Sequence, residues 1–184
     1  MSLNKKIAIL IEDRYQDLEV WYPLLRFKEE GFQVITVEPN GRKNYKGKWG
    51  YPIEVDCSID QVRAEDFEAV IIPGGGAPDH LRKSTKVLEF VKKIFDRGKI
   101  VASICHGGWV LASAGICKGK TLTSYIAIKD DMINAGANFV DKEVVRDGNL
   151  ITSRTPDDLP AFCSQIVHQL RQGILRPQTA GPSK

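Results

Sequence analysis

The sequence predicts a single α/β domain built on a mostly parallel central sheet. Short apolar segments rich in Val and Ile alternate with segments of helical period, and neither a repeat nor a linker of different composition interrupts them. The chain has 184 residues, 42% of them hydrophobic, which is enough for one domain with a substantial core. Because a parallel sheet is buried on both sides, helices are expected on each face. We expect the domain to span residues 1–175 and residues 176–184 to form a disordered tail.

The first half of the chain predicts two strands, a helix and a hairpin. An apolar strand ends in Glu12 and Asp13, and the helix that follows stops at Gly31, since glycine suits the left-handed conformation of a helix end. A second strand covers residues 32–37. Residues 40–58 contain Gly and Asn between short strand-like pieces, which predicts a hairpin outside the main sheet.

The second half predicts further strands that alternate with helices. The buried strand in FEAVIIPGGG ends in a glycine turn, and the next helix begins at Ser84, its predicted N-cap, and ends at Gly98. Residues 100–104 form a strand that leads directly into another helix. The segments KTLTSY and NFVDKEVVRDGNLITSR supply further strands, with a hairpin turn at Asp147-Gly148, and a helix closes the domain.

Composition and charge exclude several classes of function. The net charge of +3 is too small to argue for nucleic-acid binding, and no apolar run reaches the roughly 18 residues of a membrane helix. The start of the chain lacks the layout of a signal peptide, so we expect a cytoplasmic protein with no membrane partner. The cysteines and histidines lack the spacing of a zinc site, and neither a metal nor an organic cofactor is expected. The cysteines are interpreted as reduced thiols. A basic cluster is interpreted as a solvated loop: Arg42, Lys43, Lys46 and Lys48.

Cys105 lies where the strand of residues 100–104 passes into a helix. The pattern SICHG, residues 103–107, matches the small-x-nucleophile-x-small form of a nucleophile elbow, a tight turn that needs small residues on either side. Such a turn places the sulfur at a helix N-terminus, where free amides are expected to lower the pKa of the thiol below about 8.5. The alternative is a buried structural cysteine, an interpretation that suits Cys57, Cys117 and Cys163 better.

His106 and the glycine turn are the next candidates for a role in catalysis. His106 adjoins the sulfur and is a candidate base, although a catalytic imidazole needs a carboxylate to orient it; otherwise it is a polar residue that bonds a loop. The turn Gly74-Gly75-Gly76 offers approachable amides, and those of Gly75, Gly76 and His106 are the expected oxyanion hole. Glycines that merely turn the chain are the alternative. A dinucleotide-binding loop is disfavoured because the third glycine of that motif is missing.

Glu19 is the candidate acid, in the first turn of the first helix and beside an apolar stripe. A buried carboxyl there stays protonated and donates a hydrogen bond to a thiolate, whereas an exposed one only favours the helix dipole, and the sequence leaves both open. Ligands bind beyond the carboxyl ends of parallel strands, so four strand ends are expected to meet at one rim. They carry Glu12 and Asp13, the glycine turn, Cys105, and the segment ending in Tyr125, a candidate substrate contact.

Several segments together resemble the PfpI-type intracellular proteases, within the deglycase and class I glutamine-amidotransferase-like superfamily. The resemblance covers about residues 5–173 and rests on EDRYQDLEVWYPLLRFKEEGF, AVIIPGGGAPDHLR, VASICHGGWVLASAG and TSYIAIKDDMINAGANFVDKEVVRDGNLITSRTPDDLPAF. It implies a flavodoxin-like three-layer α/β/α sandwich, with Cys105 at the elbow, Glu19 beside the sulfur, and the amides of Gly75 and His106 near the reacting oxygen.

The resemblance also implies a homo-oligomer, a dimer or a hexamer. In this family a Cys-His-acid triad forms on oligomerisation, and the acid comes from a neighbouring subunit; the matching position here is Asp79. Two departures affect that triad. The family often has Glu in place of Asp79, so the carboxylate reaches one methylene less far, and it often has Pro in place of Gly108, which is expected to loosen the helix start.

The first hypothesis is therefore a cysteine-dependent hydrolase whose Cys105 attacks a carbonyl of a peptide or small substrate. A deglycase or glyoxalase that acts on methylglyoxal-type adducts uses the same sulfur, and the sequence does not separate the two. A second hypothesis is a non-enzymatic redox sensor of the stress response, in which Cys105 is oxidised and Glu19 stabilises the product. A purely structural domain ranks last.

Overall fold

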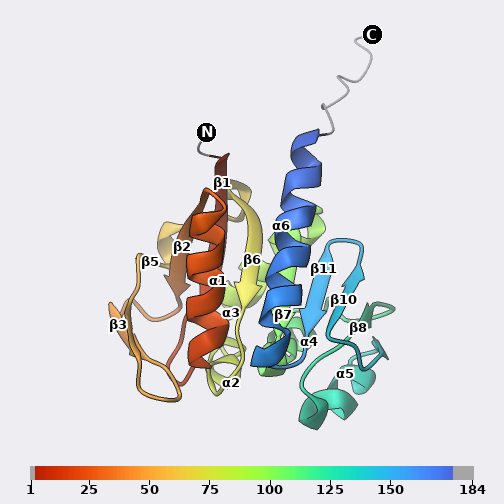
Figure 1. Ribbon diagram of the computed structural model, residues 1–184. Coiled ribbons are helices and arrows are strands. Elements are labelled where there is room, and N and C mark those ends of the chain that lie inside the picture. The colour runs from red at the N-terminus through yellow and green to blue at the C-terminus, as the bar shows by residue number, and fades with distance from the viewer. Residues whose placement is uncertain (1–2, 176–184) are drawn as a thin grey trace.

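A seven-stranded sheet forms the centre of the computed structural model, which describes residues 3–175; the expected tail at 176–184 lies outside the described residues. Every neighbouring pair of strands is parallel except β10 and β11, which confirms the mostly parallel sheet (Figure 1). Across the sheet the strands are, in order, β10 (Val144–Asp147), β11 (Leu150–Ser153), β7 (Ile100–Ile104), β6 (Phe67–Ile72), β1 (Leu3–Leu10), β2 (Phe32–Glu38) and β5 (Cys57–Ser58).

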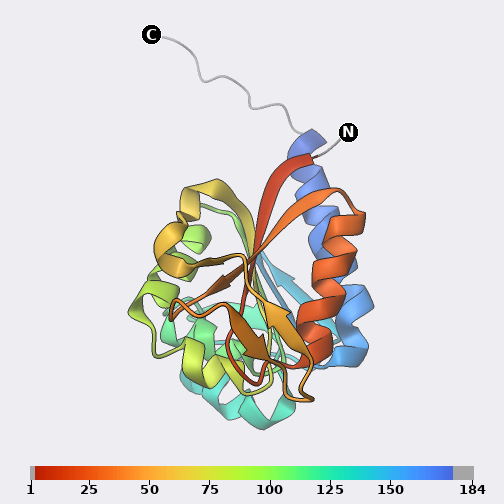
Figure 2. The same ribbon diagram turned by 90° about the vertical axis from the view of Figure 1, so that its left-hand side faces the viewer.

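Helices cover both faces of this sheet, so the molecule is the expected three-layer flavodoxin-like sandwich (Figure 2). Helices α1 (Asp17–Glu29) and α6 (Leu159–Leu175) pack side by side on one face. On the other face lie α2 (Ala77–Leu81), α3 (Thr85–Asp96) and α4 (Gly108–Ser113), with α5 (Lys129–Asn134) packed against α4. No helix within residues 3–175 is long and apolar enough to cross a bilayer.

The burial of the strands explains their composition. Ile7, Ala8, Ile9 and Leu10 of β1 are completely buried, because side chains on both faces of a covered parallel strand enter a core. Helix α3 shows the contrasting period of an amphipathic helix. Its N-cap Ser84 accepts a hydrogen bond from the amide of Val87, as predicted, and the buried residues fall on one side of the helix: Val87, Phe90, Val91 and Ile94.

The hairpin expected within residues 40–58 is present, but one predicted strand end is misplaced. Strands β3 (Asn44–Lys46) and β4 (Pro52–Glu54) pair antiparallel in a sheet of their own, as expected. The KTLTSY segment contributes only β8 (Thr121–Leu122), which pairs with β9 (Asn138–Phe139) and not with the central sheet. The reason is that β11 already pairs with the edge of β7 that faces away from β6, so no edge of β7 is left for β8. The expectation that Tyr125 follows a strand of the central sheet is therefore wrong.

Two adjacent glycines at the end of β7 give a test of the packing. A Cβ on Gly107 would lie 2.6 Å from the carbonyl oxygen of Ile72, whereas one on Gly108 would lie 2.8 Å from Met132 Sδ, part of a flexible side chain. We expect Gly107→Ala to lower the free energy of unfolding by about 1–3 kcal/mol, and Gly108→Ala to change it by less than about 1 kcal/mol. Urea denaturation measures both. Equal losses in the two variants would contradict this account of the turn.

Candidate active site

Cys105 lies at a sharp turn between β7 and α4. Its φ of +58° is left-handed, which is uncommon for a residue other than glycine, and a 3₁₀ turn over Cys105–Gly107 leads into the helix. The side chain is 8% exposed. Gly107 has no room for a Cβ beside Ile72 and Ser103, so the small residues of the SICHG pattern match the local crowding. The backbone has the geometry of a nucleophile elbow.

The glycine turn after β6 packs directly against this cysteine. A Cβ on Gly74 would lie 2.6 Å from Cys105 Cβ, 3.0 Å from its Sγ and 2.7 Å from Glu19 Oε2. Gly75, with φ of +77°, lies against the main chain of Arg14 and Tyr15, where any Cβ would overlap backbone atoms. Glycine is therefore required here so that the sulfur, the carboxyl of Glu19 and the loop after β1 can meet.

Glu19 is completely buried beside the sulfur, so of the two alternatives the buried carboxyl is the correct one. Its Oε2 accepts a 2.6 Å hydrogen bond from the amide of Gly74, and its Oε1 has no hydrogen-bond partner among the described residues. Gln16 fixes the start of α1 by accepting the amide of Glu19 on its side-chain oxygen. Burial raises the pKa of the Glu19 carboxyl to about 7. Glu19 therefore keeps its proton up to a higher pH than a carboxylic acid usually does.

The expected low pKa of Cys105 is wrong in direction. Burial, followed by the negative charge of Glu19, raises the pKa of the Cys105 thiol to about 12, while hydrogen bonds from the amides of His106 and Gly75 act in the opposite direction. The amides are the ones predicted, but the loss of water around the sulfur is the larger effect. Between these two pKa values the carboxyl and the thiol together hold one proton, and its position on oxygen or on sulfur does not depend on pH.

His106 lies beside the sulfur and two aromatic side chains. Its Nδ1 lies 3.3 Å from Cys105 Sγ, and the centroids of the Trp109 and Tyr125 rings lie 5.1 and 5.0 Å from its own. Burial and the charge of Lys48 lower the pKa of the imidazole, so it is neutral at pH 7. Tyr125 reaches the site although the preceding strand β8 lies outside the central sheet, because its amide donates to the carbonyl of Cys105 at 3.3 Å.

Three candidate groups lie away from the sulfur. The amide of Gly76 donates to the carbonyl of Arg14 at 2.7 Å, so it is not available for an oxyanion hole. Asp79 has a side chain 57% exposed and pairs with Lys83 at 3.6 Å; among the described residues no carboxylate bonds His106. Glu12 and Asp13 turn towards the hairpin, where they bind Asn40 and Arg42.

One residue near the site was missed by the sequence analysis. Lys48, assigned there to a solvated loop, carries a charge that lowers the pKa of both Glu19 and His106. No local pattern distinguishes it from the other lysines of the hairpin; only the folded position of the hairpin does. Among the described residues, no group of three His, Cys, Asp or Glu side chains is arranged to hold a metal ion.

Comparison with known proteins extends over nearly the whole chain. "Deglycase PfpI" of Pyrococcus furiosus is 45% identical over 166 residues, which are 90% of this chain and 99% of that protein. "Putative cysteine protease YraA" of Bacillus subtilis is 42% identical over 169 residues, 92% of this chain and all of that protein. The crystal structure of Drosophila melanogaster DJ-1beta superposes with a TM-score of 0.85 at 30% identity, covering 95% of this chain and 100% of that one.

The match to a family model agrees with these pairwise similarities. Residues 5–169 match the DJ-1/PfpI family, close to the extent of the resemblance inferred from the motifs. The residues matched by the family model include the elbow, the glycine turn and the first helix. The chain therefore belongs to the DJ-1/PfpI family.

Proposed function

We propose that this chain is a cysteine-dependent hydrolase of the deglycase type, in which Cys105 attacks the carbonyl carbon of a small aldehyde-derived adduct. The observation that carries the proposal is the buried contact of the sulfur with the carboxyl of Glu19 and with the amides of Gly75 and His106. A sulfur, a proton and two amide donors at one point are what addition to a carbonyl requires. The name of the P. furiosus relative, a deglycase, supports the same class.

In the proposed first step, the thiolate of Cys105 forms a bond to the carbonyl carbon. The π electron pair moves to the carbonyl oxygen, which faces the amides of Gly75 and His106, and the proton held by Glu19 passes to that oxygen. The product is a neutral thiohemiacetal. The ionised Glu19 that remains can then accept a proton from the adduct, so one carboxyl acts first as acid and then as base. Tyr125 is the proposed substrate contact, since its ring lies beside that of His106 and the residue is 37% exposed.

Peptide hydrolysis is the second candidate, favoured by the 3.3 Å contact between His106 and the sulfur. Cleavage of an amide requires a proton on the leaving nitrogen, and a catalytic histidine supplies it best when a carboxylate orients and charges it. His106 has a lowered pKa, and within residues 3–175 of its own subunit no carboxylate bonds it. A carboxylate from a neighbouring subunit is needed to complete that triad, so the single chain supports the deglycase reaction better.

Turnover with a cysteine variant tests the proposed reaction. We expect hydrolysis of a methylglyoxal adduct to fall at least about 100-fold in Cys105→Ala, because the nucleophile is lost, and to remain in Cys57→Ser, which alters another free thiol. Adduct loss is followed by absorbance, and a fluorogenic peptide is tested in parallel. Peptide cleavage without adduct hydrolysis would favour the protease. Mass gain on Cys105 with peroxide, without turnover of either substrate, would favour the redox sensor.

The proton on Glu19 also has a consequence for stability. Because its pKa is raised from 4.5 to about 7, the native state binds this proton more tightly than the unfolded chain does. The resulting stabilisation is complete below pH 4.5 and is lost as the pH rises to about 7, an effect of up to about 3 kcal/mol. In Glu19→Gln, which stays neutral, this part of the pH dependence is expected to vanish. Urea denaturation of both proteins from pH 4.5 to 8 measures the difference, and parallel curves would refute it.

We also propose that the chain forms a cytoplasmic homo-oligomer in which Asp79 completes a neighbour's site. The exposed carboxylate of Asp79 has only Lys83 as a partner within the described part of its own chain. A separate face on α1 and the hairpin exposes large apolar side chains, which supports association: Leu18, Tyr22, Leu25, Trp49 and Tyr51. The four free thiols suit a reducing compartment.

Complementation between inactive subunits tests the shared site. We expect Asp79→Asn to lower turnover about tenfold or more without changing stability, because the side chain is exposed but supplies a carboxylate across the interface. Mixing Asp79→Asn with Cys105→Ala chains is then expected to restore activity, since some sites receive both intact residues. The matched control is Asp60→Asn, another exposed acid paired with a lysine. If the mixture is only as active as its parts, Asp79 does not act across subunits.

A further inference from the structure

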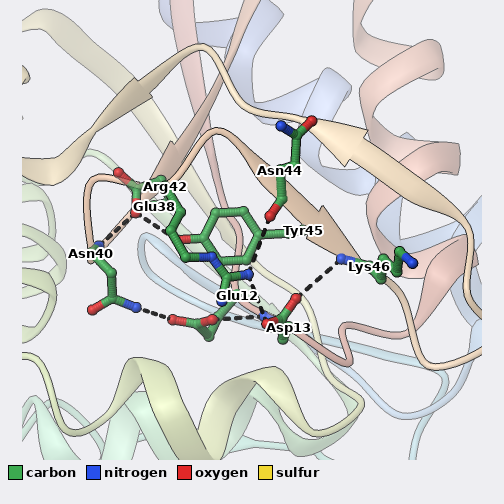
Figure 3. Close-up of polar contacts among 8 residues, drawn as sticks. All are labelled: Glu12, Asp13, Glu38, Asn40, Arg42, Asn44, Tyr45 and Lys46. Carbon is green, nitrogen blue, oxygen red and sulfur yellow. Dashed lines mark hydrogen bonds and ion pairs between the residues drawn. The ribbon is translucent and has the colours of Figure 1, made fainter.

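The base of the β3–β4 hairpin is fixed by acidic side chains at the ends of β1 and β2 (Figure 3). Glu38 is almost completely buried and accepts hydrogen bonds from the hydroxyl of Tyr45 at 2.6 Å and from the amide of Gly41 at 2.8 Å. Asp13, at the end of β1, accepts from the Arg42 side chain at 2.7 Å and from the Lys46 amide at 3.1 Å. Strand β3 therefore starts from a defined position relative to the central sheet, and β4 pairs with it.

The tip of the hairpin is held against the glycine turn. The amide of Lys48 donates to the carbonyl of Tyr15 at 2.7 Å, and Tyr15 in turn pairs with Gly75 in an isolated bridge. The next residues are held by Asp17, whose carboxylate accepts the amides of Trp49 and Tyr51 at 2.9 and 3.1 Å. The backbone of Lys48 is thus separated from Gly75, a candidate oxyanion donor, by one residue.

The two cationic residues at this contact, Lys48 and Arg14, have no counter-ion within the described part of the chain, and the Lys48 ammonium lies 5.5 Å from the centroid of the neighbouring Trp49 ring. Among the described residues, no carboxylate lies within 4.0 Å of the side-chain nitrogens of Lys48 or Arg14. Arg14 has a left-handed φ of +62°, and its Cβ and Nε lie 3.1 and 3.5 Å from the position of a Cβ on Gly76. The charge of Lys48 opposes the effect of burial on the pKa of Glu19 and adds to it for His106, so its electrostatic field reaches both groups. These are exposed cations, whereas the interior of the site is uncharged when Glu19 is protonated.

We propose that Lys48, together with Arg14, binds a carboxylate of the substrate next to the carbonyl that Cys105 attacks. The inference rests on the proposed function and narrows its substrates to adducts that keep a carboxylate, such as an aldehyde adduct of a free amino acid. A carboxylate can pair with a lysine ammonium and with the two parallel N–H groups of an arginine. Among the described residues, no protein carboxylate competes with it for Lys48 or Arg14. The neutral amide of the same adduct lacks this interaction and is expected to be the poorer substrate.

Two alkylating reagents of nearly equal size separate charge recognition from reactivity. In both, the Cys105 thiolate attacks a methylene carbon and iodide leaves, but iodoacetate carries a carboxylate and iodoacetamide does not. We expect Lys48→Gln to lower the ratio of the iodoacetate to the iodoacetamide rate at Cys105 by about three- to tenfold. A change in the fraction of thiolate affects both rates alike, so it cancels in the ratio. Arg14→Gln is expected to lower the ratio in the same direction.

The control is Lys43→Gln, which removes one positive charge from the same exposed hairpin and is expected to leave the ratio unchanged. Rates are measured at pH 9 by mass spectrometry of the Cys105 peptide, at low and at high salt, and salt is expected to reduce the ratio in the unmodified protein. An unchanged ratio in both Lys48→Gln and Arg14→Gln overturns the inference, even if the adduct is hydrolysed. A lowered ratio supports it even if no turnover is found, so the two proposals fail independently.

Discussion

The hydrogen bond from the amide of Gly74 to the buried carboxyl of Glu19 is the contact on which the site depends. It joins the turn after β6 to the first turn of α1, and the elbow after β7 packs against both. No side chain fits at Gly74 without displacing the sulfur or the carboxyl. Three elements far apart in sequence are therefore in direct van der Waals contact, and this packing excludes water from the space between them. That exclusion keeps a proton on a carboxylic acid near neutral pH.

The same exclusion changes how the cysteine is activated. An elbow at a helix start suggests a thiolate stabilised by amides, yet burial outweighs those amides and raises the pKa of the thiol. Reactivity then depends on moving one proton between Glu19 and Cys105 when an electrophile arrives. The hairpin adds a positive charge, since that of Lys48 acts to lower the pKa of both Glu19 and His106. A buried acid and an exposed cation thus act on the same groups.

Local patterns predicted most of the fold and part of the site. The strands of residues 32–37 and 100–104, the cap at Ser84 and the hairpin turn before β11 are encoded in short stretches, where apolar period and turn residues act over a few positions. The setting of Cys105 was predictable for the same reason, because the small residues that permit the elbow are its own neighbours.

What depended on distant contacts was not predictable. Whether Glu19 faces water or the core is decided by the glycine turn 55 positions later in the chain. The amide of Gly76 is occupied by Arg14, and β8 lies outside the central sheet because β11 takes the place beside β7. Lys48 gains its position only from the backbone bonds of a folded hairpin. In each case the partner is remote, so no window of sequence contains both members of the contact.

The left-handed backbone of Cys105 sets stability and chemistry against each other at one residue. A residue with a Cβ costs about 1–2 kcal/mol in this conformation, whereas glycine adopts it without strain. Glycine at this position would relieve the strain, but it would also remove a buried side chain that packs against Gly74 and would add freedom to the unfolded chain. The sulfur is therefore held in a backbone conformation that its own Cβ disfavours, and the packing around it has to supply the energy that keeps it there.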